Sequence, residues 1–305
     1  MKLKNSHLTA SVILLLCLYL LSFLNFGNAS RKAFKTALLN PKYKNEVTGF
    51  KLSKGDESVF LEKKNNFWFV KSSENSSNSV PADSDLIENL INELIKIRKL
   101  YKISDKLSVN NHFGFDYSSK FYIKCSYNGN FTDFYFGNQD FSEVFRYFMT
   151  GKNTKVYQID SSFEPYLTSL ESFWSEKTII SKKLLNISSN QDIQSVVVNS
   201  KRIDASSADK SFVSYTQTLL ELRHGGILDT DSAFFSKLLT HPPEAQIFIE
   251  LGNKNSLSLK VYKSSEKNAV ENEYVLIVNY ENLNLKAVYK ISGWTLSKLL
   301  QNKAN

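Results

Sequence analysis

The sequence LIKIR at residues 94–98 is echoed by LLELR at residues 219–223, and this repetition decides the predicted fold. Each copy ends a helical pattern, and each precedes a turn and an aspartate, Asp105 or Asp229. The offset between matching stretches runs from 125 to 132 residues, a drift that loop insertions explain. Two further echoes follow in the same order along the chain: 121–124 with 246–249, and 156–159 with 288–291.

The echoes predict two similar units, over residues 47–185 and 190–302, each with an antiparallel sheet, one long helix and one short helix. The 22 phenylalanines and 15 tyrosines favour strands. Helices packed on one face of antiparallel sheets define the α+β class, which is the fold class we expect. Chance similarity between β-rich stretches is the alternative explanation of the echoes.

Local patterns place the elements of the first unit. Alternating apolar residues over 47–71 predict a three-stranded meander. Apolar residues at three- and four-residue steps predict a helix that Asp83 or Ser84 caps and that continues to Tyr101. The dipeptide Asn128-Gly129 predicts a hairpin, and Gly151 marks a second one. A short helix is expected over 163–174, with Leu167 and Leu170 pointing inward. The three tryptophans are expected to pack in the core or as a lid rather than to serve as ligand platforms.

The apolar run LTASVILLLCLYLLSFLNF at residues 8–26 carries no charge. Its 19 residues are close to the roughly 20 that cross a bilayer as a helix, whereas its dense centre has the length of a signal-peptide core. Residues 1–30 are therefore predicted to be a membrane anchor or a signal segment, and 31–46 a linker. The residues that represent the predicted contact with the lipid bilayer are Leu8, Val12, Leu16, Leu20, Leu24 and Phe26.

The charges around this run give conflicting orientations. More lysines and arginines follow the run than precede it, which favours a cytoplasmic C-terminal part. A short basic tail with Lys2 and Lys4 directly before an apolar run is, however, typical of exported chains. We expect a single-pass protein of the cytoplasmic membrane with the bulk of the chain extracytoplasmic.

No stretch of the sequence has the pattern of a catalytic, cofactor or metal site, so the chain is not predicted to be an enzyme. The four histidines (7, 112, 224 and 241) have no metal-ligand spacing to another His, Cys or acid. The glycines do not cluster as phosphate-binding loops do. Cys17 and Cys125 offer no disulfide within residues 31–305. The net charge of +8 comes from scattered lysines without a basic-aromatic cluster, so nucleic-acid binding is not expected.

The sequence Phe113-Gly114-Phe115-Asp116 is the candidate interaction loop. Two exposed aromatic rings beside a glycine would suit contact with a partner. The alternative is a tight turn that feeds a strand, with both phenylalanines buried beneath it.

The order of these motifs resembles an uncharacterised bacterial domain family that is encoded beside gliding-motility-type ABC transporters. The shared features are a Trp-containing strand pair, an amphipathic helix, the Phe-Gly-Phe-Asp turn and Val-Tyr-x-Ile before a Leu-x-x-Leu pattern, and they cover most of residues 47–302. No catalytic residue is assigned in that family. The matching residues are Trp68, Leu90, Leu94, Gly114, Phe115, Asp116, Gly137, Val156, Tyr157, Leu222 and Arg223.

The resemblance implies an accessory envelope protein that works with an ABC exporter or a related membrane assembly. The partners expected are a transporter permease subunit or an exported substrate, contacted by binding rather than catalysis. Two alternatives stay open: an exported envelope enzyme whose site is assembled from distant residues, and a structural spacer.

Overall fold

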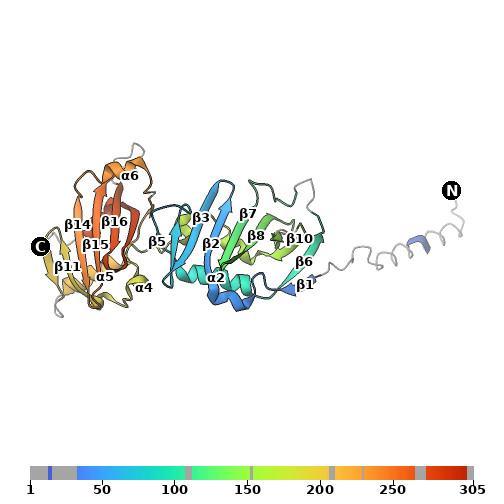
Figure 1. Cartoon of the computed structure of the whole chain (residues 1–305), viewed down its shortest axis with the longest axis horizontal. Helices are drawn as coiled ribbons and strands as arrows, with labels where there is room; N and C mark the ends of the chain where they lie inside the picture. The colour runs from blue at the N-terminus through green and yellow to red at the C-terminus, as the bar shows by residue number, and fades with distance from the viewer. Residues whose placement is uncertain are drawn as a thin grey trace, which may run out of the picture.

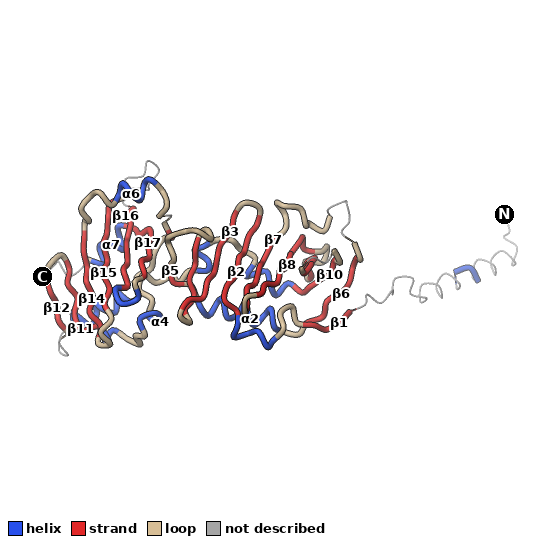
Figure 2. Tube along the Cα trace, viewed as in Figure 1, coloured by secondary structure: helices blue, strands red, loops and turns tan. Residues whose placement is uncertain are grey.

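The computed structural model describes residues 13–15, 33–106, 112–151, 154–205, 210–228, 230–264 and 273–300. This part of the chain is mostly β, with 43 % strand in two large antiparallel sheets that stand side by side (Figures 1 and 2). The α+β prediction is therefore wrong. The longest helices described, α2 (Ser84–Ile95) and α5 (Lys210–Glu221), have only 12 residues each, and most of the other residues in regular structure pair as strands.

The predicted anchor at residues 8–26 lies outside the described residues except for 13–15, which are helical. Each anchor residue predicted to contact lipid (Leu8, Val12, Leu16, Leu20, Leu24 and Phe26) lies outside them. In the ranges that the structure describes, no helix has both the length and the apolar character needed to cross a membrane.

Ten strands form the first sheet, in the order β1-β6-β10-β9-β8-β7-β2-β3-β4-β5. The predicted meander is confirmed, because β2, β3 and β4 pair consecutively. The predicted hairpin is also confirmed: Asn128 and Gly129 have φ of 45° and 71°, as a two-residue turn requires. The strands are β1 (Ala33–Thr36), β2 (Val47–Lys54), β3 (Glu57–Lys64), β4 (Phe67–Lys71), β5 (Val80–Pro81), β6 (Arg98–Ser104), β7 (Phe121–Tyr127), β8 (Asn130–Gln139), β9 (Phe145–Thr150) and β10 (Val156–Asp160).

Helix α2 packs its apolar stripe on one face of the first sheet. The Asp83 side chain caps it by accepting a hydrogen bond from the Leu86 amide at 3.1 Å. Leu90 and Leu94 are fully buried. The helix ends at Ile95 rather than at the predicted Tyr101, because the chain from Arg98 onward pairs with β1 and β10 as strand β6.

The single short helix expected over 163–174 is absent. A 3-10 helix η2 (Ser161–Tyr166) and one turn of α-helix, α3 (Glu171–Trp174), occupy its place. Pro165 lies inside η2, and a proline has no amide hydrogen to continue an α-helix. Leu170, expected to point inward, is 60 % exposed, whereas Trp174 is fully buried.

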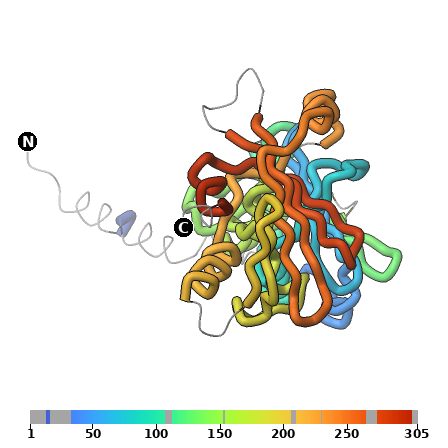
Figure 3. The backbone as a smooth tube through the Cα atoms, turned by 90° about the vertical axis from the view of Figure 1, so that its left-hand side faces the viewer, coloured from blue at the N-terminus to red at the C-terminus, as the bar shows by residue number. Residues whose placement is uncertain are grey.

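Seven strands form the second sheet, in the order β12-β11-β14-β15-β16-β17-β13. Figure 3, which looks along the long axis from this unit, shows α5 and α7 (Gly293–Leu299) together at one side of the sheet and α6 (Ala233–Leu238) at its upper end. Trp294 in α7 is 65 % exposed, so this tryptophan does not lie in the core. The strands are β11 (Ile193–Val198), β12 (Lys201–Asp204), β13 (Gly226–Ile227), β14 (Ala245–Leu251), β15 (Ser256–Lys263), β16 (Glu273–Tyr280) and β17 (Leu285–Ser292).

The remaining elements are short. They are η1 (Pro41–Glu46), α4 (Lys182–Leu185), η3 (Asn190–Asp192) and η4 (Glu281–Leu283).

The two sheets share one strand order. Seven strands of the first sheet match the seven strands of the second, both in their position in the sheet and in their order along the chain. The matching orders are β3-β2-β7-β8-β9-β10-β6 and β12-β11-β14-β15-β16-β17-β13. The first sheet adds β1 at one edge and β4 and β5 at the other. The three sequence echoes fall on equivalent elements. The echo of 121–124 with 246–249 is out of register by one residue, because Phe121 faces the core and Gln246 faces solvent.

The connection from β6 to β7 in the first unit and that from β13 to β14 in the second cross the same face of their sheets. We call this face, opposite α2 in the first sheet and opposite α5 in the second, the outer face. In the first unit Phe113 and Phe115 pack there on Val156, and in the second α6 packs there on Val288. Val156 and Val288 are the paired residues of the third sequence echo. The repeated architecture therefore includes a partial second layer.

The loop that joins β4 to β5 ties the two sheets together. Asn78, 5 % exposed, donates from Nδ2 to the carbonyl oxygens of Leu228 (2.8 Å) and Val288 (3.3 Å). Its Oδ1 accepts a hydrogen bond from the Val288 amide at 3.2 Å. The segment that links the two units also forms one β-bridge to each of them: Ser175 pairs with Ala82 of the first unit, and Thr178 pairs with Arg223 of the second. One apolar core runs through both units.

The substitution Asn78→Ala is expected to destabilise the fold by about 2–3 kcal/mol, because it leaves the buried amide of Val288 without its partner. Urea unfolding of the purified chain measures this loss. Asn75→Ala in the same loop is the matched control: Asn75 is exposed, and its replacement should cost no more than about 0.5 kcal/mol. Equal losses for the two variants would contradict the role given to Asn78.

Candidate functional site

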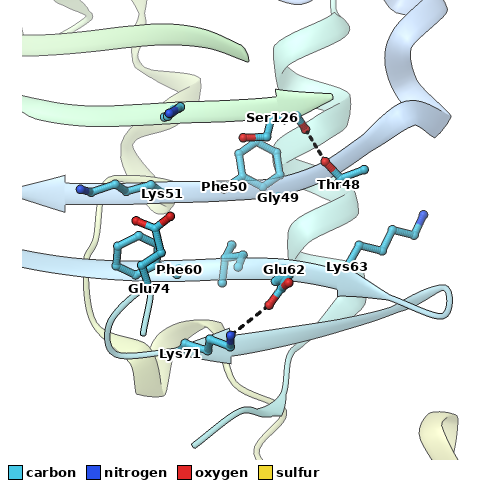
Figure 4. Close-up of a pocket in the computed structure, with 12 residues that line it drawn as sticks. Thr48, Gly49, Phe50, Lys51, Phe60, Glu62, Lys63, Lys71, Glu74 and Ser126 are labelled. Carbon is cyan, nitrogen blue, oxygen red and sulfur yellow. Dashed lines mark hydrogen bonds and ion pairs between the residues drawn. The ribbon is translucent and has the colours of Figure 1, made fainter. Parts of the chain in front are cut away.

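A groove of about 370 Å³ lies on the outer face of the first sheet, across strands β2, β3, β4 and β7 (Figure 4). Gly49 on β2 lies directly opposite Ser126 on β7 and Glu62 on β3. Gly49 has no side chain and that of Ser126 is small, so the sheet offers little bulk at this point and the surface is hollowed. The polar and aromatic groups around the floor are Lys51, Phe60, Glu62, Lys71, Glu74 and Lys124.

Two lysines stand side by side in this groove. Lys51 and Lys124 are directly opposed residues of β2 and β7, so their Cβ atoms are about 5 Å apart and their charges repel. Lys51 Nζ lies 5.3 Å from the ring centre of Phe60, and Lys124 Nζ lies 4.2 Å from that of Phe131. Ring faces attract ammonium groups, and these two contacts hold the lysines toward opposite sides. Neither lysine has an ion pair with another described residue.

The acidic residues of the groove differ in their surroundings. Glu62 pairs with Lys64 Nζ at 3.0 Å and with Lys71 Nζ at 3.1 Å (Figure 4). Partial burial alone would raise the pKa of the Glu62 carboxyl, but the hydrogen bonds from Lys64 and Lys71 outweigh it and lower that pKa. Glu74, on the loop after β4, makes no ion pair within the described ranges and extends over the groove beside Phe60. The β2–β7 side of the groove thus carries two lysines without an ion pair, and the loop side carries one carboxylate, Glu74, without an ion pair among the described residues.

A second hollow, of about 260 Å³, opens on the same face and is lined mainly by tyrosines. The rings of Tyr122 and Tyr135 are 5.3 Å apart, and Lys120 Nζ lies 5.6 Å from the ring centre of Tyr135. Burial and the hydrogen bond to Asp133 (2.7 Å) raise the pKa of Tyr122, so the phenol stays neutral. Asp133 is the residue opposite Lys124 in the sheet, but its carboxylate is engaged by Tyr122.

The three described histidines, His112, His224 and His241, do not line either hollow. His224 stacks on Tyr289 with ring centres 4.6 Å apart, its Nε2 is 2.8 Å from the Glu176 carbonyl oxygen, and burial lowers its pKa. His112 contacts the Phe113 ring, and His241 lies near the Lys237 carbonyl. Over the described residues, no three or more His, Cys, Asp or Glu side chains are placed to hold a metal ion.

The arrangement in the groove offers binding contacts: two ammonium groups, an aromatic wall and one carboxylate.

Residues 68–211 match the family model described as a domain of unknown function, DUF4340. This is consistent with the coarser expectation of an uncharacterised domain family. No curated protein and no solved structure shows a significant match to the chain. A link to ABC transporters goes beyond the DUF4340 match and is a proposal.

The DUF4340 match begins in β4 and ends in α5. It therefore includes Lys71 and Lys124 of the groove, whereas Lys51 and Phe60 precede it. The groove is therefore built partly from residues within the DUF4340 match and partly from residues that precede it.

The candidate interaction loop also lies within the DUF4340 match, but the structure does not bring it to the groove. Phe113 and Phe115 are each only 7 % exposed and belong to the small apolar cluster on the outer face. The Asn138 amide donates to the Phe113 carbonyl at 2.8 Å, and Asp116 Oδ1 accepts from the Ser119 amide at 2.8 Å. A partner at this loop would meet its backbone and polar groups, because both aromatic rings are buried.

Gly114 explains why this loop can lie so close to β8. Its φ is +71°, and a Cβ placed on it would meet Asn138 Oδ1 at 2.3 Å and the Asn138 amide nitrogen at 2.7 Å. Gly137 is equally crowded, because its Cβ would lie 2.0 Å from the Phe113 carbonyl oxygen. These two glycines allow the loop backbone to pack directly on the strand.

Replacing Gly114 by alanine should cost about 3 kcal/mol, from the positive φ together with the clash on Asn138. Gly129→Ala is the matched control: Gly129 also has a φ of +71°, but nothing lies within 4 Å of its Cβ position, so only the backbone cost of about 1 kcal/mol applies. Denaturant titration of both variants gives the difference. Similar losses would show that the loop is not packed on β8 as described.

Proposed function

We propose that this protein acts by binding rather than by catalysis, as a membrane-anchored, extracytoplasmic accessory protein of an ABC-type transporter or a related envelope assembly. The observation that carries the binding role is the groove with its opposed lysines, Lys51 and Lys124. The transporter association rests on the family resemblance, and the anchoring on the apolar run at residues 8–26.

The lysine pair favours a binding role because it is unfavourable for the sheet itself. Like charges at directly opposed positions destabilise an antiparallel pair. Conflicts of this kind between local residues and the fold are expected mainly where a function requires them. A ligand group of opposite charge would remove the repulsion, so the groove is better matched to an occupied state than to an empty one.

A structural spacer is the second candidate function, and the junction between the sheets favours it. The three hydrogen bonds of Asn78 and the shared core make the two units one stiff body. A spacer needs length and stiffness but no particular chemistry in the groove. The two functions therefore differ in whether a partner lies against Phe60.

A photoreactive p-benzoylphenylalanine at Phe60, which is half-buried in the groove wall, should cross-link the full-length chain to a transporter subunit in native membranes. The same group at Gln217, exposed on α5 far from the groove, is the control and should give no such product. Mass spectrometry of the ultraviolet-dependent product identifies the partner. Recovery of no transporter subunit from Phe60 would exclude the transporter role, and recovery of no partner at all would favour the spacer.

An extracytoplasmic location predicts that the variant Asn75→Cys reacts with a membrane-impermeant maleimide on intact cells, because residue 75 is exposed on the loop after β4. Burial raises the pKa of the native Cys125 thiol to about 12, so this residue should stay unlabelled and the wild-type chain is the control. Labelling that appears only after the membrane is permeabilised would place the domain in the cytoplasm.

A further inference from the structure

Two lysines of the groove, Lys51 and Lys124, lie on directly opposed residues and make no ion pair with another described residue. Glu62 is already neutralised by Lys64 and Lys71, so it does not balance the pair formed by Lys51 and Lys124. Asp133, directly opposite Lys124 in the sheet, keeps its negative charge, but its carboxylate accepts a hydrogen bond from Tyr122 and forms no ion pair with Lys124. The two ammonium groups are held by ring contacts on opposite sides, and a small anionic group could lie between them.

The repeated architecture does not require this lysine pair. In the second sheet β11 and β14 take the places of β2 and β7, and none of their registered pairs contains a lysine. Val197 lies opposite Phe248, and Ser195 lies opposite Glu250, which pairs with Arg202 at 2.8 Å. The same topology thus forms without opposed like charges, and the pair in the first sheet is a specific feature of its groove.

The surrounding charges indicate the kind of ligand. Carboxylates lie on both sides of the lysines, with Asp133 on β8 and Glu74 on the loop, and they would repel a uniform polyanion or an anionic membrane. A ligand with one carboxylate at the lysines, an apolar group on Phe60 and a basic group at Glu74 would match each feature in turn. An extended polypeptide segment with mixed charges has this arrangement, since its side chains on one face repeat about every 6.6 Å.

We propose that the groove receives an extended, mixed-charge segment of a partner protein and that a carboxylate side chain of this segment lies between Lys51 and Lys124. This inference rests on the proposed binding function and adds the chemical class of the partner. The low floor at Gly49 and Ser126 accommodates the carboxylate, and the Phe60 ring supports the apolar neighbour.

The test uses the full-length chain in detergent micelles and a fluorescein-labelled decapeptide in which Glu, Val and Lys alternate. The peptide should bind, and Lys51→Gln and Lys124→Gln should each weaken binding by about 2- to 5-fold, the range of a partly exposed ion pair. Lys99→Gln, an exposed lysine on β6, makes the same change in net charge and should leave the affinity unchanged. Urea unfolding should show both groove variants to be at least as stable as wild type, because the repulsion is removed.

Two comparison ligands decide between chemical classes. An all-Glu decapeptide and vesicles of phosphatidylglycerol should both bind less tightly than the mixed-charge peptide. Tighter binding of either one would overturn the inference in favour of a polyanion or a lipid surface. Failure of the mixed-charge peptide to bind, or equal effects of the three lysine variants, would also overturn it.

The same variants separate this inference from the proposed function. If the Phe60 cross-link to a transporter subunit persists in the Lys51→Glu, Lys124→Glu double variant, the transporter role stands and the carboxylate site is wrong. If the cross-link never forms but peptide binding depends on both lysines, the site stands and the transporter role is wrong.

Discussion

One buried amide side chain, that of Asn78, hydrogen-bonds the first sheet to the second beside the apolar core that both units share. Asn78 reaches from the loop between β4 and β5 of the first sheet and bonds to the backbone of β17 and of the residue after β13 in the second, as a neighbouring strand would. A buried backbone amide needs a partner, and no described strand of the first sheet pairs with β17. The side chain therefore substitutes for a strand at the junction, and the shared core forms around it.

The outer face of each sheet is only partly covered by a second layer of chain, and the groove lies where this cover is missing. In each unit the chain between the third and fourth common strands covers one end of this face, with Phe113 and Phe115 in the first unit and α6 in the second. The other end of the first sheet, over β2, β3 and β7, has no such cover. The same connection that completes the small apolar cluster thus leaves the lysine pair accessible.

The sequence predicted the features that depend on neighbouring residues. The meander, the Asn128-Gly129 hairpin and the cap at Asp83 follow from local alternation and turn chemistry. The end of α2 and the helix at 163–174 were mispredicted because partners distant in sequence decide them: Arg98 pairs with Thr36 in β1, and Trp174 is buried at the junction. Lys51 and Lys124 are outward positions of two predicted strands, and only the register between those strands brings them together.

The shared strand order also bears on how the chain folds. In each unit the pairing that completes the sheet, β2 with β7 or β11 with β14, joins segments far apart in sequence, so it forms only after most of that unit has been synthesised. The two sets of pairings do not involve each other, and each unit can close independently as it leaves the ribosome. Asn78, by contrast, bonds to β17, the last of the described strands. Docking of the two units through Asn78 therefore requires β17 of the second sheet.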